Sequence, residues 1–171
     1  MNKGKIVFLC GPTSTGKTSI VDAMQDISEE FFYAIANDLV AQMVGEKYYR
    51  IDFLKYQGKA VYYMYHMAKL LSDMGENVLI DGTMQEEQIQ NHYETVMEIF
   101  KESPLTLVEV FCPLEICRER NLARGDRWEM QSAEQMKNWN PNVKYDIRVE
   151  THLHSPTECA AEILQYVFPA I

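Results

Sequence analysis

Positive charge is scarce in this chain. Sixteen lysines and arginines stand against 25 aspartates and glutamates, which gives a formal net charge of −9. An acidic surface of this size repels nucleic acid and anionic membranes, so neither is an expected partner. Long apolar runs are also missing: residues 6–10, the longest early run, are too few for a signal peptide or a membrane span. The sequence therefore predicts a cytoplasmic protein.

Cysteine pairs with metal-binding or redox spacing are absent as well. The four cysteines form no C-x-x-C pair, and each lies in or beside an apolar run. They are Cys10, Cys112, Cys117 and Cys159. We expect buried free thiols in a reducing compartment, and no zinc site.

The length and composition favour one globular domain. A chain of 171 residues is close to the usual size of a single domain and can bury a full core without disulfides. Hydrophobic residues make up 47% and charged residues 24% of the chain, which is ordinary for a folded protein and excludes a disordered or fibrous one. We therefore expect a single domain over residues 1–171.

Short apolar runs alternate with longer amphipathic stretches. The patterns predict strands at residues 5–10, 31–36, 78–80, 105–111 and 146–151, and helices at 17–28, 52–73, 85–101, 113 to about 123, and 155–167. The last helix has Ser155 as its N-cap, Pro156 at its first position and Glu158 three residues after the cap. Alternating strands and helices predict a parallel sheet covered on both faces, a three-layer α/β fold. The polar residues 124–142 are the expected mobile part.

One motif follows the first strand directly and opens the first helix. The residues are Gly11, Pro12, Thr13, Ser14, Thr15, Gly16, Lys17 and Thr18, followed by Ser19, and they fit G-x-x-x-x-G-K-[ST]. Strand, loop and helix in this order are the context that confirms a phosphate-binding loop. Glycines let backbone N–H groups turn toward one anion, and the helix N-terminus adds partial positive charge. The motif predicts nucleotide binding.

The end of this motif also predicts a magnesium site. Lys17 is expected to reach the β- and γ-phosphates, and the Thr18 hydroxyl is expected to ligate Mg²⁺. Asp81 follows the apolar run at residues 78–80, so it is a candidate to hold the same metal through water.

Arginines gather after the fourth predicted strand. Arg118, Arg120, Arg124 and Arg127 lie within ten residues of an otherwise acidic chain. On a helix that ends at Gly125, Arg120 and Arg124 share a face. We expect a lid at about residues 118–142 that brings these guanidinium groups over the phosphates during transfer. The alternative is a solvated helix face paired with neighbouring glutamates.

Two absences narrow the choice among nucleotide-binding proteins. The N-K-x-D tetrad that reads guanine does not occur, and the chain is too short for a two-lobed motor. A compact kinase remains, which moves the γ-phosphoryl group of ATP to a small acceptor. An acceptor of the nucleotide, shikimate or nucleotide-sugar type is a second possibility, and a nucleotide-binding regulatory module without catalysis is a third.

Several stretches of the chain resemble the chloramphenicol phosphotransferase-like family. They are residues 123–127 (ARGDR), 143–146 (VKYD), 149–151 (VET) and 155–160 (SPTECA), together with residues 11–18 and 78–81. The resemblance implies a nucleoside-monophosphate-kinase-like fold with strand order 2-3-1-4-5, the cofactors ATP and Mg²⁺, and phosphorylation of a hydroxyl on a small organic acceptor. The family's named activity inactivates the antibiotic chloramphenicol, so the resemblance also implies antibiotic resistance.

The resemblance places a catalytic aspartate just after the second strand. Asn37 stands at that position, and Asp38 is one residue further on. A carboxylate at the carboxyl end of a strand is well placed to take the proton of an attacking alcohol, which makes Asp38 and Asp81 the two candidate bases. The alternative for Asp38 is an N-cap of a helix that begins near Leu39.

Aromatic residues crowd the region before and inside the second predicted helix. Tyr62, Tyr63 and Tyr65 cannot all face one core, so some of them are candidates to line an acceptor site. Arg50 is the only arginine before the arginine segment, with three lysines near it. A negatively charged acceptor needs more arginines early in the chain, so this scarcity disfavours a charged acceptor. We expect a small-molecule acceptor that is neutral and partly aromatic, and the oligomeric state stays open.

Overall fold

The structure is a computed structural model that describes residues 2–125 and 129–169. Five parallel strands form one sheet in the order β2-β3-β1-β4-β5. They are β1 (Ile6–Cys10), β2 (Phe32–Ala36), β3 (Asn77–Gly82), β4 (Leu105–Phe111) and β5 (Ile147–Glu150). This order confirms the predicted α/β fold.

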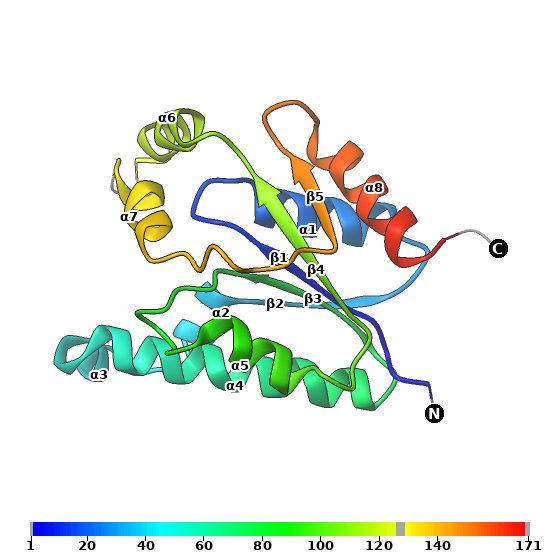
Figure 1. Ribbon diagram of the computed structural model, residues 1–171, viewed down its shortest axis with the longest axis horizontal. Helices are drawn as coiled ribbons and strands as arrows, with labels where there is room; N and C mark the ends of the chain where they lie inside the picture. Colours follow the sequence, from blue (N-terminus) through cyan, green and yellow to red (C-terminus); the bar gives the residue numbers. More distant parts are fainter. Residues whose placement is uncertain (1, 126–128, 170–171) are drawn as a thin grey trace.

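Helices cover both faces of the sheet. They are α1 (Lys17–Ile27), α2 (Asn37–Ala41), α3 (Glu46–Ile51), α4 (Phe53–Asp73), α5 (His92–Ile99), α6 (Leu114–Arg124), α7 (Gln131–Lys137) and α8 (Pro156–Val167). In Figure 1 helices α1 and α8 lie on one side of the sheet, and α4 and α5 lie on the other. In the described part of the chain, no helix has the length and apolar character needed to cross a membrane.

The central strand explains why both layers form. Successive side chains of a strand point to opposite faces. Ile6 and Phe8 belong to the core beneath α4 and α5, whereas Val7 and Leu9 belong to the core beneath α1 and α8. All four side chains are 0% exposed. The uninterrupted apolar run of β1 is therefore the pattern of a strand that is buried on both sides.

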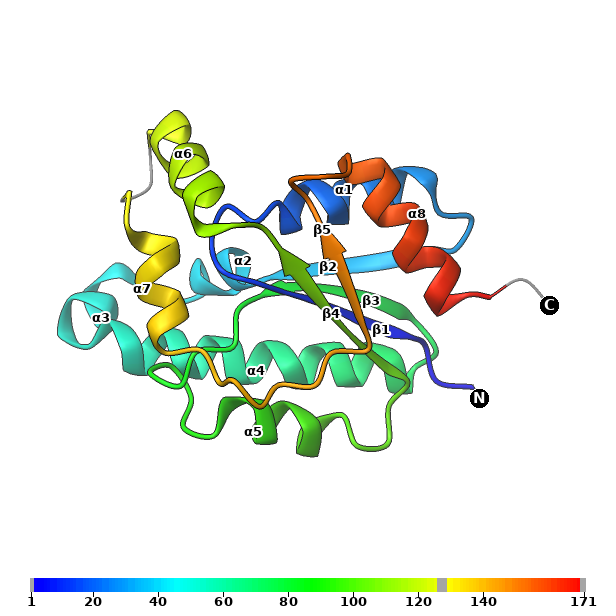
Figure 2. The ribbon, with the colours of Figure 1, turned by 45° about the horizontal axis from the view of Figure 1, so that its top comes forward.

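The carboxyl ends of the parallel strands meet at one edge of the sheet. The loop at residues 11–16 follows β1, Asn37 follows β2, and Thr83 follows β3. Figure 2 shows α2, α6 and α7 gathered at this same edge. Ligands of open parallel sheets bind outside these strand ends, so this edge is where a site is expected.

The helix predicted at residues 85–101 is wrong in its first half. Helix α5 begins at His92, because Asn91 adopts a left-handed conformation with φ 53° and Gln85 pairs with Trp139 in an isolated β-bridge. The Glu86 carboxylate then accepts hydrogen bonds from the N–H groups of Asn91 (2.8 Å) and His92 (3.2 Å). An acidic side chain at a helix N-terminus satisfies amides that lack an intrahelical partner.

Other elements compare closely with the sequence pattern. The capping box of α8 is confirmed, with both Ser155–Glu158 hydrogen bonds present. Two short helices, α3 and α7, had no predicted counterpart, and α2 corresponds to the helix considered near Leu39 but begins two residues earlier, at Asn37. Helix α7 lies within the polar residues 124–142, which the sequence left without an element. The sequence pattern does not predict α7 because the helix has no apolar stripe; it contacts the phosphate loop through hydrogen bonds of polar side chains.

All four cysteines are buried and free, as the sequence predicts. Burial raises the pKa of Cys10 and of Cys117 to about 12. These thiols are therefore protonated at neutral pH and unreactive, since the thiolate is the nucleophilic form.

A buried histidine predicts acid sensitivity. His92 is 0% exposed; its Nδ1 lies 3.0 Å from the Gln85 carbonyl oxygen and its Nε2 lies 2.8 Å from the Tyr65 hydroxyl. Burial lowers its pKa below the ordinary value of 6.5. As the pH falls through about 6.5, His92 is protonated in the unfolded chain but stays neutral in the folded chain. Its contribution to the free energy of unfolding is therefore fully present above that pH and is lost as the pH falls below it.

We expect the free energy of unfolding to decrease by as much as ~1.4 kcal/mol per pH unit below pH 6.5 because of this one group. Urea titrations between pH 7.5 and 5 measure the slope. The His92→Gln variant is expected to be less stable at pH 7 but to have a flatter slope. His154→Gln, at an exposed position, is the control. An equal slope in wild type and His92→Gln would contradict the assignment.

Candidate active site

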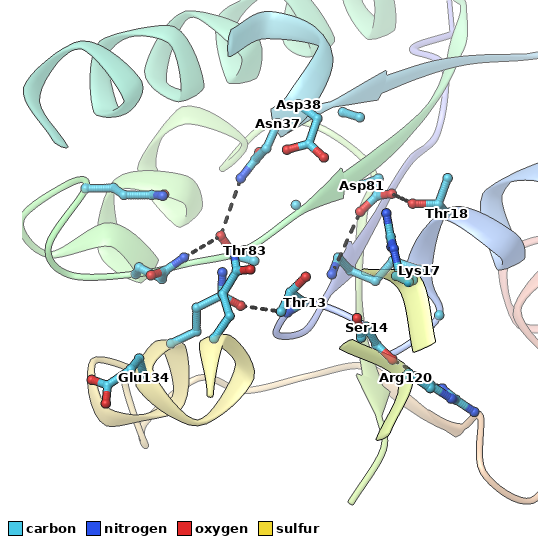
Figure 3. Close-up of a pocket in the computed structure, with 18 of the residues that line it drawn as sticks. Thr13, Ser14, Lys17, Thr18, Asn37, Asp38, Asp81, Thr83, Arg120 and Glu134 are labelled. Carbon is cyan, nitrogen blue, oxygen red and sulfur yellow. Dashed lines mark hydrogen bonds and ion pairs between the residues drawn. The ribbon is translucent and has the colours of Figure 1, made fainter. Parts of the chain in front are cut away.

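A cavity of about 880 Å³ opens at the carboxyl edge of the sheet. Its walls come from the loop after β1, the start of α1, the residues after β2 and β3, the first turns of α4, and helices α6 and α7. Figure 3 shows these segments around one space. The cavity therefore unites the phosphate loop with segments that are distant in sequence.

The loop between β1 and α1 has the shape of an anion cradle. Gly16 has φ 99°, and Ser14 is left-handed with φ 61°. Thr15 is fully buried behind the loop, where its hydroxyl donates to the Pro12 carbonyl over 3.0 Å. Alternation of this kind turns backbone N–H groups inward. Of the predicted nucleotide-binding residues, Thr13, Ser14, Gly16, Lys17, Thr18 and Ser19 line the cavity, while Gly11, Pro12 and Thr15 do not.

Lys17 holds the loop together from within. Its Nζ donates to the carbonyl oxygens of Gly11 and Pro12, each at 2.9 Å, and lies 4.0 Å from a carboxylate oxygen of Asp81. Burial lowers the pKa of Lys17, and the Asp81 carboxylate opposes this shift. Lys17 is thus a buried cation beside the loop, near the carboxylates of Asp81 and Asp38, and a bound phosphate would add further negative charge around it.

Thr18 and Asp81 meet across the sheet edge. The Thr18 hydroxyl donates to Asp81 Oδ2 over 2.6 Å (Figure 3). The pairing of β1 with β3 brings the two elements together, because Leu9 stands opposite Asp81 in the register. A hydroxyl and a carboxylate are hard oxygen donors of the type that Mg²⁺ takes, with the remaining positions left to water and phosphate. The residues present therefore fit this metal.

The four arginines of the basic segment divide into separate groups. Arg120 and Arg124 both line the cavity, as their shared helix face predicts. The Arg120 guanidinium donates to the carbonyl oxygens of Ser14 (3.3 Å) and Thr151 (2.9 Å). Arg118 instead pairs with Glu129 at the surface, which fits the solvated alternative. Arg127 lies outside the described residues.

The residues after β2 present a carboxylate and an amide to the cavity. Helix α2 begins at Asn37 with Ala36 as its N-cap, so the N-cap interpretation of Asp38 is wrong. Figure 3 shows the Asp38 carboxylate on the side of Asp81 and the Asn37 amide directed toward Thr83. The Asn37 Nδ2 donates to the Thr83 hydroxyl over 3.4 Å, while its Oδ1 is buried without a partner among the described residues.

The wall opposite the phosphate loop is rich in amides. Phe53, Leu54 and Gln57 reach it from the start of α4, and Thr83, Gln85 and Gln88 from the loop after β3. The expectation that Tyr62, Tyr63 or Tyr65 lines the site is wrong: Tyr65 is fully buried in the core, and the other two lie outside the cavity. Among the described cavity residues, the basic side chains are Lys17, Arg120 and Arg124.

A close backbone approach fixes this wall. A Cβ placed on Gly58 would lie 2.0 Å from the carbonyl oxygen of Gln88. Only glycine allows the loop after β3 to rest directly on α4 at this point. The glycine within a predicted helix was thus a usable signal of close packing, whereas the amides of Gln57 and Gln85 belong to no motif that sequence reasoning could detect.

Two solved kinase structures have a similar fold. The chain superposes with a TM-score of 0.70 on a Mycobacterium tuberculosis APS kinase in complex with AMPPNP and APS, at 17% identity, covering 96% of this chain and 98% of that one. A shikimate kinase from Acinetobacter baumannii, in complex with shikimate, gives a TM-score of 0.70 at 16% identity, with 97% and 94% covered. These likenesses confirm the P-loop kinase fold.

Sequence comparison places the chain more narrowly. A Mycobacterium tuberculosis protein (strain H37Rv) named "Putative O-phosphotransferase" is 26% identical over an alignment of 190 residues. The alignment covers 95% of this chain and 82% of that protein. Family comparison matches residues 4–168 to the description "Chloramphenicol phosphotransferase-like protein". Taken with the phosphate loop and the fold, these findings support a P-loop kinase. The chain belongs to the chloramphenicol phosphotransferase-like family.

Proposed function

We propose that this protein is an ATP-dependent O-phosphotransferase that phosphorylates a hydroxyl group of a small, neutral organic acceptor. The observation that carries the proposal is one cavity in which a phosphate loop faces a carboxylate, Asp38, and an amide-rich wall. Such a cavity can hold a nucleoside triphosphate and a hydroxyl compound end to end. Family membership supports the same reaction class.

In the nucleotide half, residues 11–19 hold the phosphates. Backbone N–H groups of the loop bind the phosphate oxygens, and Lys17 supplies the charge for the β- and γ-phosphates. Arg120 and Arg124 lie at the cavity wall, where a guanidinium offsets charge that develops on the transferred group. The proposal assigns Arg127, which follows in the same segment, to this group as well.

Magnesium is assigned to Thr18 and Asp81. When bound, Mg²⁺ neutralises charge on the β- and γ-phosphate oxygens. The Asp81 carboxylate already accepts a hydrogen bond from Thr18 and lies near Lys17, so its oxygens are directed to the phosphate side of the cavity. This geometry favours Asp81 as the metal residue rather than the base.

Asp38 is then the candidate base for the acceptor. The acceptor oxygen attacks the γ-phosphorus, the new O–P bond forms as the bond to the β–γ bridging oxygen breaks, and ADP leaves. The hydroxyl proton passes to the Asp38 carboxylate. The position of Asp38 in the first turn of α2, beside the phosphate loop, supports this role.

The acceptor wall supports a neutral molecule. Acceptors with phosphate, sulfate or carboxylate groups need cations of their own, and among the described cavity residues the basic side chains all belong to the nucleotide half. Amides and hydroxyls bind uncharged donors and acceptors instead. Phe53 and Leu54 add apolar surface for a partly aromatic compound.

A panel assay tests the proposal. The purified protein is incubated with MgATP and either neutral hydroxyl compounds, chloramphenicol included, or the anionic acceptors shikimate and APS. Formation of ADP and the mass of the acceptor are measured together, because ADP alone also reports hydrolysis. We expect phosphorylated product from neutral acceptors and none from shikimate or APS.

Other outcomes contradict the proposal in separate ways. Product from an anionic acceptor alone would favour the kinases of charged substrates. Binding of MgATP without transfer to any compound would favour a regulatory module, which Asn37 at the family's aspartate position also supports.

A further inference from the structure

Helix α7 is hydrogen-bonded to the phosphate loop through the backbone N–H and the backbone carbonyl of Thr13. The N–H of Thr13 donates to Gln135 Oε1 over 2.6 Å, and the Ser132 hydroxyl donates to the carbonyl oxygen of Thr13 over 2.9 Å. Ser132 is 2% exposed. Helix α7, for which the sequence predicts no element, is therefore hydrogen-bonded to Thr13 of the phosphate loop.

A fully buried asparagine joins this contact to helix α6. Asn121 is 0% exposed. Its Oδ1 accepts from the Ser14 hydroxyl (2.6 Å), and its Nδ2 donates to the Ser132 hydroxyl (3.0 Å) and to the carbonyl oxygen of Glu129 (3.2 Å). Because a carbonyl only accepts, the Glu129 contact fixes which amide atom faces which neighbour. The Ser14 hydroxyl donates to Asn121, and the Ser132 hydroxyl accepts from Asn121 while it donates to the Thr13 carbonyl, so the hydrogen-bond directions of these three contacts are mutually consistent.

The residue that Asn121 holds has an unfavourable backbone conformation. Ser14 and Asn91 are the non-glycine residues with positive φ in the described ranges 2–125 and 129–169. A left-handed conformation costs a non-glycine residue on the order of 1 kcal/mol or more, and it persists only where the surroundings enforce it. At Ser14 the side-chain bond to Asn121 supplies that restraint.

We propose that Asn121 is a positioning residue that couples the α6–α7 segment to the phosphate loop. It holds Ser14 left-handed, which directs the loop amides into the cradle, and it holds Ser132 against Thr13. Asn121 does not itself line the cavity, so it acts through Ser14 and Ser132. The inference rests on nucleotide binding by the loop and is independent of the acceptor's identity.

Calorimetric titration with MgATP tests the first half of this proposal. Asn121→Ala is expected to raise the Kd for MgATP about tenfold, because Ser14 is released from the binding conformation. Leu122→Ala, the next residue on α6 and 57% exposed, is the matched control and is expected to bind as wild type does. Absence of MgATP binding by the wild type would overturn the proposed function. An unchanged Kd in Asn121→Ala would overturn this inference alone.

A double-mutant cycle separates positioning from simple loss of packing. Glycine adopts the left-handed conformation freely, so a Ser14→Gly background removes the need for a side chain that restrains residue 14, and the Kd of Ser14→Gly itself is the reference for the cycle. In the Ser14→Gly background, Asn121→Ala is expected to change the Kd less than about threefold. The same tenfold loss in both backgrounds would overturn the positioning role, since a packing defect does not depend on residue 14.

Ser132→Ala provides a second route that removes a single oxygen. It is expected to raise the Kd for MgATP about threefold, by releasing Thr13 and loosening Asn121. This variant decides the question should Asn121→Ala fail to fold. A wild-type Kd in Ser132→Ala would then overturn the coupling.

Discussion

Replacing Lys17 with alanine is expected to lower kcat by roughly 10²–10³-fold and to weaken MgATP binding. The variant removes the cation that faces the β- and γ-phosphates. It also removes two hydrogen bonds of 2.9 Å, to the carbonyl oxygens of Gly11 and Pro12, which hold the loop together. Both losses act on the nucleotide half, so binding and turnover fall together.

Calorimetry with MgATP and steady-state kinetics measure the two effects. Lys101→Ala is the matched control, because Lys101 is an exposed lysine that pairs with Glu98 on the surface. Its removal is expected to leave both quantities unchanged. Wild-type binding and turnover in Lys17→Ala would mean that the loop after β1 is not the nucleotide site, and the proposed function would not survive.

The parts of the site that lie close together in sequence were predictable. Residues 11–18 form the loop because glycines, a strand and a helix stand in direct succession, and Thr18 reaches Asp81 because β1 and β3 are neighbours. The sheet order follows from the same family pattern. These features depend on local chemistry and on strand pairing, both of which leave a mark in the sequence.

The parts built from isolated polar residues were not predictable. Asn121 meets Ser14 across 107 positions, and Gln135 meets Thr13 across 122. A single amide side chain on an amphipathic or polar segment forms no periodic pattern, so the sequence does not indicate which residue it contacts. His92 shows the same limit: the pattern predicts a helix from residue 85, and nothing in it marks His92 as the true first residue or as buried against Tyr65.

Asp38→Asn is expected to lower kcat by roughly 10²–10⁴-fold while the Kd for MgATP stays within about threefold of wild type. Asparagine keeps the size of the side chain but takes no proton from the acceptor. Asp81→Asn is the comparison that separates the two carboxylates. Because Asp81 bonds Thr18 and faces Lys17, its change is expected to raise the Mg²⁺ concentration needed for half-maximal rate. Single-turnover kinetics and a Mg²⁺ titration measure these effects.

The family's own aspartate position supplies the decisive variant. Asn37 directs its Nδ2 toward Thr83, and its Oδ1 is buried above Gly82 rather than in the open cavity. A carboxylate at residue 37 in the same orientation would have one oxygen buried above Gly82 and the other directed toward Thr83, not toward the phosphate loop. We expect the double variant Asn37→Asp with Asp38→Asn to remain as slow as Asp38→Asn alone. Recovery of turnover would place the base at residue 37, and the wild-type chain, which has asparagine there, would then need a different route for the proton.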